Sequence, residues 1–361
     1  MSYYYSPIDL FPYIFIVILL LVMLTTCTIT EKKKSLIIFS AFFLFTSLRY
    51  GVGWDYFEYK DFITSGETEK FEFLSRLVLD IGYYADFYPL PFAIFSFLIL
   101  IYTKIVIDRY SENITISWIA FFSIPFLFSA SLSTIRQALA SSLLLYSFTF
   151  AYTKKYLKFL LVILTAYFFH SSGIFGLLIY PIVRWKATRN FLLLLFISSF
   201  MMSSILQYVI FSFSFYNNFD TRILIYLRNS DNAKQGIYMP FLFYFLTLFN
   251  IYFYKDLVRF KPINSIFISL STFGVFLYNI LEFEPHSAFR IGGMFMSFWI
   301  LIFPSYPKIS KLLVFHKYMV SSALLLIFAF LIDSHIKAYL SGTLEKISFI
   351  PYDFWLLHLN D

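Results

Sequence analysis

Charged residues are scarce in this sequence. Only 14% of its 361 residues are Asp, Glu, Lys or Arg, whereas 60% are hydrophobic and the mean hydropathy is +0.74. A soluble domain carries roughly 25% charged residues and keeps them on its surface. The chain has too few charges to coat a globule in water, so its composition excludes a soluble-domain fold.

Cysteine and the common cofactor motifs are also missing or nearly so. Cys27 is the single cysteine, so no disulfide can form within the chain. The sequence has no G-x-x-x-x-G-K-[ST] loop, no G-x-G-x-x-G fingerprint, no H-E-x-x-H motif and no Cys/His cluster. We therefore expect no metal site and no cofactor. The absence of a D-x-D motif argues against a metal-dependent enzyme that uses nucleotide sugars.

Long apolar runs are abundant instead. Runs of about 20 residues, long enough to cross hydrocarbon, recur from one end to the other. Because unpaired backbone polar groups are costly in lipid, these runs must be helices. The pattern predicts an all-α fold, a polytopic transmembrane bundle of about ten to twelve passes in a single integral membrane domain, residues 1–361. The clearest runs are Ile8–Ile29 (read as a retained helix because no basic segment precedes it), Leu36–Leu48, Pro89–Ile107, Phe191–Ile210, Met239–Tyr254, Ile263–Leu281 and Leu312–Ile332.

The basic residues gather in short connectors between these runs. Six connectors hold 17 of the 28 Lys and Arg residues and only four acidic residues. Lys and Arg concentrate in the cytoplasmic loops of membrane proteins, so these connectors are expected to face the cytoplasm. The net charge of +7 is thus explained by the orientation of the chain in the membrane and gives no reason to expect a nucleic-acid partner. The connectors are Lys32–Lys34, Lys104 with Arg109, Lys154 to Lys158, Arg184 to Arg189, Lys255 to Lys261, and Lys308 to Lys317.

If the N-terminus lies outside and successive helices cross the membrane in alternate directions, each connector can be assigned to one side of the membrane. This assignment predicts one helix over residues 115–130, another over 137–152, and two long external segments, 49–88 and 211–238. The tail, residues 333–361, is expected outside. The other external loops are short.

The first external segment contains an amphipathic pattern. Glu72, Arg76 and Asp80 recur at every fourth residue, and Phe73 and Leu77 are among the apolar residues that fill the other face. Such a helix is expected to lie at the membrane interface.

One stretch breaks the regular alternation. Lys158 and Arg184 both look cytoplasmic, yet only 25 residues separate them, which is too few for two full crossings at 1.5 Å per residue. We predict a helical hairpin of two short arms, or one kinked, re-entrant-type element, with His170 near its apex. Non-helical backbone at membrane depth is tolerated only against protein or a wet cavity, so a cavity is expected there.

Ionisable residues at helix ends are candidates for function, because charges are otherwise rare in these passes. In the segment 49–59, Gly51 and Gly53 allow a sharp bend that brings Arg49 close to Asp55. The alternative to a functional role is an Arg49–Asp55 ion pair that caps the helix. Both interpretations place a guanidinium and a carboxylate at the membrane boundary.

Two further arginines lie in predicted external connectors. Arg136 follows Ser133 and Thr134, and this combination suits phosphate recognition by charge-assisted hydrogen bonds. The alternative is a structural pairing of Arg136 with a neighbouring carboxylate. Arg290 follows Glu282 in a turn before a late helix, and its place at the membrane edge makes it a candidate for function.

His170 is the remaining candidate. An unperturbed histidine has a pKa near 6.5 and is a natural general base near neutral pH. A lone histidine in an apolar setting is equally often a hydrogen-bonded core residue. With three arginines at the outer face and no metal ligands, these groups indicate an anionic, lipid-linked substrate whose diphosphate leaves as guanidinium groups stabilise its charge.

The motifs that contain these residues resemble the EpsG family of Wzy-type bacterial polysaccharide polymerases. They are R-Y-G-V-G-W-D-Y-F-E-Y at 49–59, I-R-Q-A-L-A at 135–140 and F-H-S-S-G at 169–173. Order and approximate spacing match over most of the chain, and Arg290 matches a weaker late pattern. The chain departs from the family at Trp54, where many members have a small polar residue.

The resemblance implies a GT-C-like bundle in the bacterial inner (cytoplasmic) membrane, with the active site facing the periplasm or the cell exterior. It implies a metal-independent glycosyltransferase that joins undecaprenyl-diphosphate-linked oligosaccharide repeats and releases the lipid diphosphate. Expected partners are this substrate, membrane lipid and a chain-length regulator protein. The roles it implies are diphosphate binding by Arg136, Arg290 and Arg49, activation of the acceptor hydroxyl by His170 or Asp55, and support by Gly53, Tyr59, Gln137 and Glu282.

Two other functions remain open at this point. An O-antigen ligase would share the lipid diphosphate donor and the Arg/His chemistry. A lipid-linked oligosaccharide flippase or transporter would typically show paired interrupted helices in two related halves, and no such repeat is visible. The identity of the sugars, the linkage and the kind of polymer are not specified by the sequence.

Overall fold

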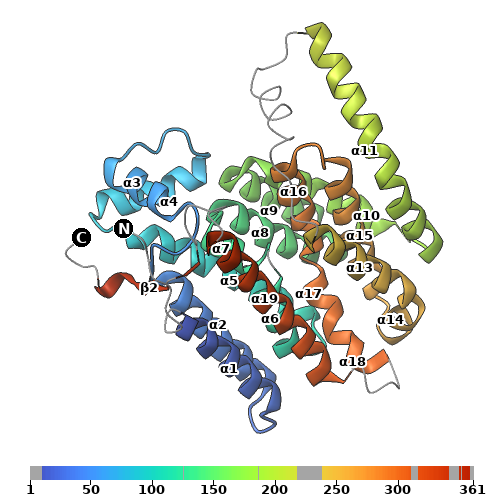
Figure 1. Ribbon diagram of the computed structural model, residues 1–361, viewed down its shortest axis with the longest axis horizontal. Coiled ribbons are helices and arrows are strands. Elements are labelled where there is room, and N and C mark those ends of the chain that lie inside the picture. The colour runs from blue at the N-terminus through green and yellow to red at the C-terminus, as the bar shows by residue number, and fades with distance from the viewer. Residues whose placement is uncertain are drawn as a thin grey trace.

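The computed structural model describes residues 10–124, 126–185, 187–217, 238–309, 316–340, 349–350 and 352–357. Most of these residues are helical, and the helices pack around one contiguous apolar core (Figure 1). Among the described residues, β-structure is limited to one pair of two-residue strands. The expected all-α class is therefore confirmed.

The first half of the chain supplies most of the helices around the candidate site. Two of them follow the sequence closely, since helices were expected over 89–107 and 137–152. The helix expected over 115–130 is instead interrupted, because a proline at position 125 lacks an N–H group and cannot continue it. These elements are α1 (Phe11–Thr25), α2 (Glu31–Ser47), α3 (Tyr56–Ser65), α4 (Phe73–Tyr84), α5 (Pro89–Tyr110), α6 (Ile114–Ser123), α7 (Phe128–Leu132) and α8 (Ile135–Tyr152).

The predicted hairpin is present, with His170 between its two arms. The first arm is α9 (Tyr156–Phe169), and the second is the 3-10 helix η2 (Ser171–Leu178) continued by α10 (Ile179–Arg184). The arms touch at Gly173, where an added Cβ would lie 2.5 Å from the backbone carbon of Ala166. Each arm has 14 residues; the first is roughly 21 Å long at 1.5 Å per residue, and the second, with its 3-10 turn at about 2.0 Å per residue, is roughly 25 Å. Both are shorter than the roughly 30 Å of hydrocarbon in a bilayer.

The second half of the chain begins with α11 (Arg189–Asn217), which extends beyond the other helices at the upper right of Figure 1. Residues 211–217, expected as part of an external segment, belong to this helix, and residues 218–237 lie outside the described part. The following helices, α13 and α14, meet at an angle of 64°. The remaining elements are α13 (Tyr238–Tyr252), α14 (Tyr254–Phe260), α15 (Asn264–Ile280), α16 (Pro285–Met296), α17 (Trp299–Ile302), η4 (Phe303–Ser305), α18 (Tyr306–Ile309) and α19 (Lys317–Leu340).

Several described helices could cross a bilayer. Three stretches are long and apolar enough, and the bent pair α13–α14 makes a fourth if it counts as one span. Six further apolar helices have 10–17 residues. The chain is thus a polytopic helical membrane protein, while the number of ten to twelve passes stays a prediction. The three long stretches are Pro89–Tyr110, Arg189–Leu206 and Pro285–Ile309.

Close packing joins α15 to α16, the helix that carries Arg290. An added Cβ at Gly274 would lie 2.8 Å from the carbonyl oxygen of Gly292, and the reverse distance is also 2.8 Å. Small residues allow two helix backbones to approach this closely inside a membrane. Elsewhere in the core, Asn279 donates a hydrogen bond of 2.7 Å to Ser199 and so links α15 to α11.

A segment near the C-terminus returns to the C-terminal end of α2. Strand β1 (Arg49–Tyr50) pairs antiparallel with β2 (Asp353–Phe354), so that Arg49 lies opposite Phe354. The N–H of Trp355, in the short helix η6 (Trp355–Leu357), donates to the Leu48 carbonyl at 3.0 Å. The last described residues therefore fix the loop that follows α2, a contact that the sequence did not predict.

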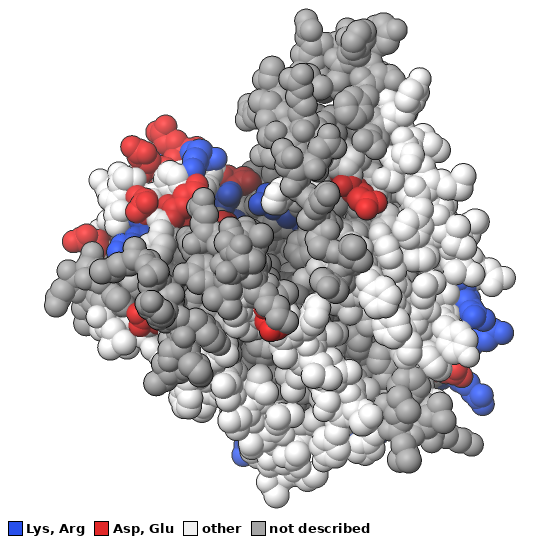
Figure 2. Space-filling model, viewed as in Figure 1, with Lys and Arg blue, Asp and Glu red and all other residues white. Residues whose placement is uncertain are grey.

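The segment 49–88 contains two helices, and α4 is amphipathic as predicted. Phe73, Leu77 and Ile81 form an exposed apolar stripe, while Val78 and Leu79 are buried. Acidic side chains gather over α3 and α4, whereas a group of basic side chains lies beside α14 (Figure 2). The segment thus combines a buried face with exposed charge and an apolar edge.

Candidate active site

The loop after α2 packs against the junction of α7 and α8. Gly53 has φ +109°, and an added Cβ would lie 1.9 Å from the carbonyl oxygen of Leu132, so only glycine fits. The next residue, Trp54, donates its backbone N–H to the Ser133 hydroxyl at 3.1 Å. This close approach brings the 49–59 motif against the residues that precede Arg136.

Arg49 is fully buried in this loop, with 1% of its surface exposed. Its guanidinium donates to the carbonyls of Thr46, Val52 and Leu132 and lies 5.1 Å from the centre of the Phe92 ring. Backbone carbonyls thus hold the charge, and the ion pair with Asp55 is not formed. These contacts connect the end of α2 to the end of α7.

Arg136, in the first turn of α8, points toward α3 and the start of α4. Its Nε donates to the Tyr59 hydroxyl at 2.8 Å, its Nη1 forms an ion pair with the Glu72 carboxylate, and its charge lies 4.6 Å from the centre of the Phe71 ring. Burial raises the pKa of Tyr59, so the phenol stays neutral even though Arg136 acts in the opposite direction. The alternative given for Arg136, pairing with a carboxylate, is therefore realised.

Glu72 connects Arg136 to the hairpin apex. One carboxylate oxygen pairs with the Arg136 guanidinium, and the other accepts a hydrogen bond of 3.0 Å from the backbone N–H of Ser171. A second bond joins the same elements, since the Ser75 hydroxyl donates to the Phe169 carbonyl at 2.6 Å. The start of α4 thus covers the apex and brings His170 into the neighbourhood of Arg136.

The His170 ring is held through Nδ1. The N–H of Ser172 donates to Nδ1 at 3.2 Å, and the Ser172 hydroxyl lies 2.6 Å from the same atom. If the N–H bond dominates, the neutral ring carries its proton on Nε2 and presents a donor. If Nδ1 is protonated and donates to the hydroxyl, Nε2 presents a lone pair and can act as a base. Ser172 therefore sets which of the two roles the ring performs.

His170 is neutral near pH 7. Burial lowers its pKa to about 4, Glu72 acts in the opposite direction, and Arg136 and Arg290 lower the pKa further. Since both arginines act on one imidazole, they lie within electrostatic range of it. The structure therefore brings Arg136, Arg290 and His170 into one neighbourhood, with Glu72 among them.

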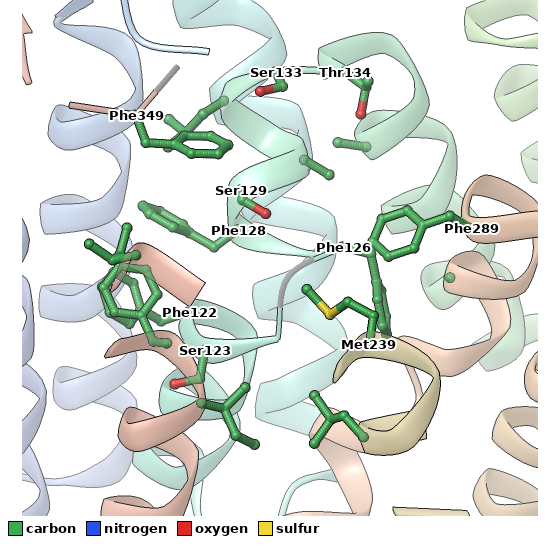
Figure 3. Close-up of a pocket in the computed structure, with 18 of the residues that line it drawn as sticks. Phe122, Ser123, Phe126, Phe128, Ser129, Ser133, Thr134, Met239, Phe289 and Phe349 are labelled. Atoms are coloured by element: carbon green, nitrogen blue, oxygen red, sulfur yellow. The ribbon is translucent and has the colours of Figure 1, made fainter. Parts of the chain in front are cut away.

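A cavity of about 1270 Å³ lies beside this cluster. Its walls come from the α7–α8 junction, the starts of α13 and α16, and α19. Most of the lining is apolar. Figure 3 shows the Ser133 and Thr134 hydroxyls at one end and rings such as Phe122 and Phe126 farther in. A cavity was expected at the hairpin apex, but no residue of the hairpin lines this one, and α4 covers the apex instead.

Arg290 brings positive charge to this cavity. It lines the wall from α16, is exposed, and its guanidinium forms no hydrogen bond or ion pair with any residue that the structure describes. Gln137 lines the cavity from α8. Neighbouring residues on a helix lie about 100° apart, so Gln137 faces the cavity while Arg136 faces Tyr59 and Glu72.

Two further candidates lie at the edge of this arrangement. Asp55 precedes α3, is partly buried, and lies within electrostatic range of Tyr59. Glu282 is exposed beyond α15, where it lies within range of Tyr244 and Tyr278 rather than in the cavity wall. Across the described ranges, no three His, Cys, Asp or Glu side chains come close enough together to hold a metal ion.

Glu72 and Ser172 belong to the site although no sequence motif assigns them a role. Glu72 fits the polar face of an amphipathic helix, and nothing in the local sequence shows that its partner lies 64 residues away. Ser172 was part of a recognised motif, but the hydrogen bonds to Nδ1 depend on the turn that the hairpin makes. Both residues support the ones that were selected.

Comparison with known proteins adds one result. The model of the EpsG family matches residues 32–354, nearly the whole chain. No curated protein and no solved structure matches the chain.

Proposed function

The chain belongs to the EpsG family, which includes Wzy-like polysaccharide polymerases, and we propose that it joins undecaprenyl-diphosphate-linked oligosaccharide repeats. The family and the apolar helices indicate an integral membrane protein of polysaccharide biosynthesis with a polymerase-type activity. Our proposal adds the lipid carrier, the bacterial inner membrane, and reaction at its outer face.

One observation supports this most directly. The cavity of about 1270 Å³ is apolar over most of its wall, and on one side it has the exposed guanidinium of Arg290, which has no partner among the described residues. A polyprenyl diphosphate has two matching parts: a long apolar chain for the apolar wall and a dianionic head for the guanidinium. An apolar wall favours the chain through the hydrophobic effect, and a guanidinium binds phosphate oxygens in a bidentate manner.

The proposed reaction is a glycosyl transfer. A hydroxyl oxygen on the non-reducing end of a new repeat attacks C1 of the reducing-end sugar of the growing chain. The bond between C1 and the diphosphate oxygen breaks, its electron pair stays on the lipid diphosphate, and the hydroxyl proton passes to a base. Arg290, with help from Arg136, is proposed to stabilise the leaving diphosphate in place of a metal ion, while Arg49 supports the site through the loop that it holds.

His170 or Asp55 is proposed to receive the proton. A neutral imidazole at pH 7 is suited to this task, provided that Nδ1 donates to Ser172 and Nε2 is left with its lone pair. The Arg136–Glu72 pair supports the same site by holding the first residue of η2.

The first test is polymer length in cells. Arg290→Ala and His170→Ala, at wild-type protein level, are expected to shorten the polymer ladder to single repeats, because each removes a group that acts in the transition state. Arg76→Ala is the matched control, since Arg76 is exposed and, among the described residues, forms an ion pair with Asp80 alone, at 3.6 Å. Wild-type ladders from both site variants would contradict the assignments.

The second test uses purified protein. Full-length protein in lipid vesicles, supplied with lipid-linked repeats and lipid A core and with no ion gradient, is expected to lengthen the repeats and to release lipid diphosphate. Transport without lengthening would contradict the proposal, as would transfer only onto lipid A core.

A further inference from the structure

The cavity wall contains a polar side chain, Gln137, whose carboxamide oxygen has no hydrogen-bond partner among the described residues. The residue is 8% exposed. Buried polar groups in proteins are nearly always hydrogen-bonded. A hydrocarbon chain could not satisfy this oxygen, so the group indicates a ligand that brings a hydroxyl or an amide N–H.

Trp54 provides a flat apolar surface on the same cavity. Its side chain is 37% exposed and lines the cavity. The position is fixed by the close approach of Gly53 to Leu132 and by the bond from the Trp54 N–H to Ser133. These backbone contacts hold the indole at the cavity wall, where part of its surface is exposed.

Other groups on this part of the wall are polar. Gln137 and Ser141 lie one turn apart on the face of α8 that lines the cavity, and Ser133, just before this helix, lines it too. The Thr134 hydroxyl also lines it, near Ser133 in Figure 3. This row of hydroxyl and amide groups differs from the aromatic wall formed by Phe122, Phe126 and their neighbours.

A pyranose ring matches this combination. One face of such a ring carries C–H groups that can lie against an indole, and its rim carries hydroxyls that donate to and accept from an amide. Exposed tryptophan presents a large, rigid surface at low conformational cost. A site built to hydrogen-bond a hydroxyl also rejects ligands that lack it.

We infer that Trp54 and Gln137 form a saccharide subsite at the polar end of the cavity, where Trp54 stacks on a sugar ring and Gln137 bonds to a hydroxyl or acetamido group. The inference rests on the proposed function, because it assigns these residues to the sugar nearest the lipid diphosphate. It makes them binding residues that affect substrate choice and take no part in proton transfer.

The test measures binding and turnover separately. The binding probe is the repeat oligosaccharide freed of lipid and diphosphate by mild acid, titrated into full-length protein in nanodiscs and followed by saturation-transfer NMR. Turnover is followed with the intact lipid-linked repeat. The variants are Trp54→Ala, Trp54→Phe and Gln137→Leu, with Trp185→Ala as the control, since Trp185 is 59% exposed and does not line the cavity.

We expect Trp54→Ala and Gln137→Leu each to weaken probe binding and to raise KM about tenfold, with kcat within threefold of wild type. Trp54→Phe keeps a flat ring and should recover most of the affinity, and Trp185→Ala should equal wild type. Recovery by Trp54→Phe also shows that the loss does not come from misfolding.

The outcomes distinguish a failure of the saccharide subsite from a failure of the polymerase proposal. Unchanged KM and unchanged probe binding in both site variants would overturn the subsite while leaving a wild-type polymerase intact. A fall in kcat with unchanged KM would overturn it as well. If wild-type protein binds the free oligosaccharide but never lengthens the lipid-linked repeat, the polymerase proposal fails and the saccharide subsite stands.

Discussion

The three arginines of the candidate site differ in how their charges are balanced. Arg49 is held by backbone carbonyls, Arg136 by a carboxylate and a phenol, and Arg290 by no described residue. A guanidinium that already has an anionic partner must exchange it before it binds a diphosphate, whereas a solvated one does not. Arg290 is therefore the first contact that an incoming diphosphate would make, and Arg49 contributes through the fold of the loop.

The role of His170 can be tested through Ser172. Ser172→Ala removes the hydroxyl that would accept a hydrogen bond from a protonated Nδ1 of His170. The ring then keeps its proton on Nε2 and loses its function as a base. We expect polymerisation by purified protein to fall roughly tenfold or more, in line with the 10²–10⁴-fold typical of general base catalysis. Ser171→Ala is the control, because Ser171 contacts Glu72 only through its backbone. Equal rates for both variants would contradict the assignment.

The pH profile gives an independent measurement. A base must be unprotonated, and the pKa of His170 is lowered to about 4, so this residue causes no loss of rate as pH falls from 8 to 6. A loss carried by His170 should begin only as pH approaches 4. The charged groups that act on the ring are Glu72, Arg136 and Arg290. A wild-type decline centred near pH 6.5 that disappears in His170→Asn would contradict this prediction.

A single substitution at Gly53 is expected to disrupt the packing of the loop after α2 against α7. Gly53→Ala adds a Cβ 1.9 Å from the Leu132 carbonyl oxygen at φ +109°, so the loop must leave α7. Strained φ values alone cost about 1–3 kcal/mol. We expect a lower melting temperature and loss of polymer. Gly66→Ala is the control: Gly66 also has positive φ, but its nearest neighbour is the Tyr83 side chain, which can move.

At the scale of elements, local signals predicted some boundaries well. The helices α5 and α8 begin and end within three residues of the expected ranges, because their apolar runs have clear polar or proline boundaries. The hairpin followed from charge placement and length together. The break between α6 and α7 was missed because the apolar run continues through Pro125, even though proline cannot continue a helix.

What could not be predicted depends on contacts between distant segments. The cavity lies away from His170 because α4 covers the hairpin apex through Glu72 and Ser75. Sequence patterns show which face of α4 is polar but not which element it meets. The candidate residues were recognised by type and motif, while their partners required the fold.

The crossing of α15 and α16 is expected to control Arg290. Gly292→Ala adds a Cβ 2.8 Å from the Gly274 carbonyl oxygen, so the helices must separate, and overpacking typically costs about 1–3 kcal/mol. We expect a lower melting temperature in nanodiscs and reduced polymerisation. Gly293→Ala is a matched control on the same helix, because its Cβ would meet only the Phe126 side chain, at 3.2 Å. Equal effects of the two substitutions would contradict this view of the crossing.

At the scale of the whole molecule, the two ends of the chain stabilise one another. The Tyr13 hydroxyl donates to the Phe349 carbonyl at 2.6 Å, the Tyr352 hydroxyl donates to the Phe45 carbonyl, and β2 pairs with β1. Phe349 also lines the cavity. The C-terminal segment is therefore part of the site's framework.

Removal of residues 349–361 should test this. We expect the shortened protein to melt at a lower temperature and to make little polymer, because Arg49 loses its strand partner and the cavity loses part of its wall. Removal of residues 358–361 alone is the control. A fully active protein that ends at residue 348 would show that the pairing of the two ends is dispensable.

The pairing of β1 with β2 also has a consequence for synthesis. The partner of Arg49 leaves the ribosome roughly 300 residues later, which at about 5–20 residues per second means a delay of roughly 15–60 seconds. During that time the backbone of Arg49 and Tyr50 has no partner strand. A premature stop codon near the end of the gene would make this state permanent, so we expect such products to be cleared by membrane proteases rather than to accumulate.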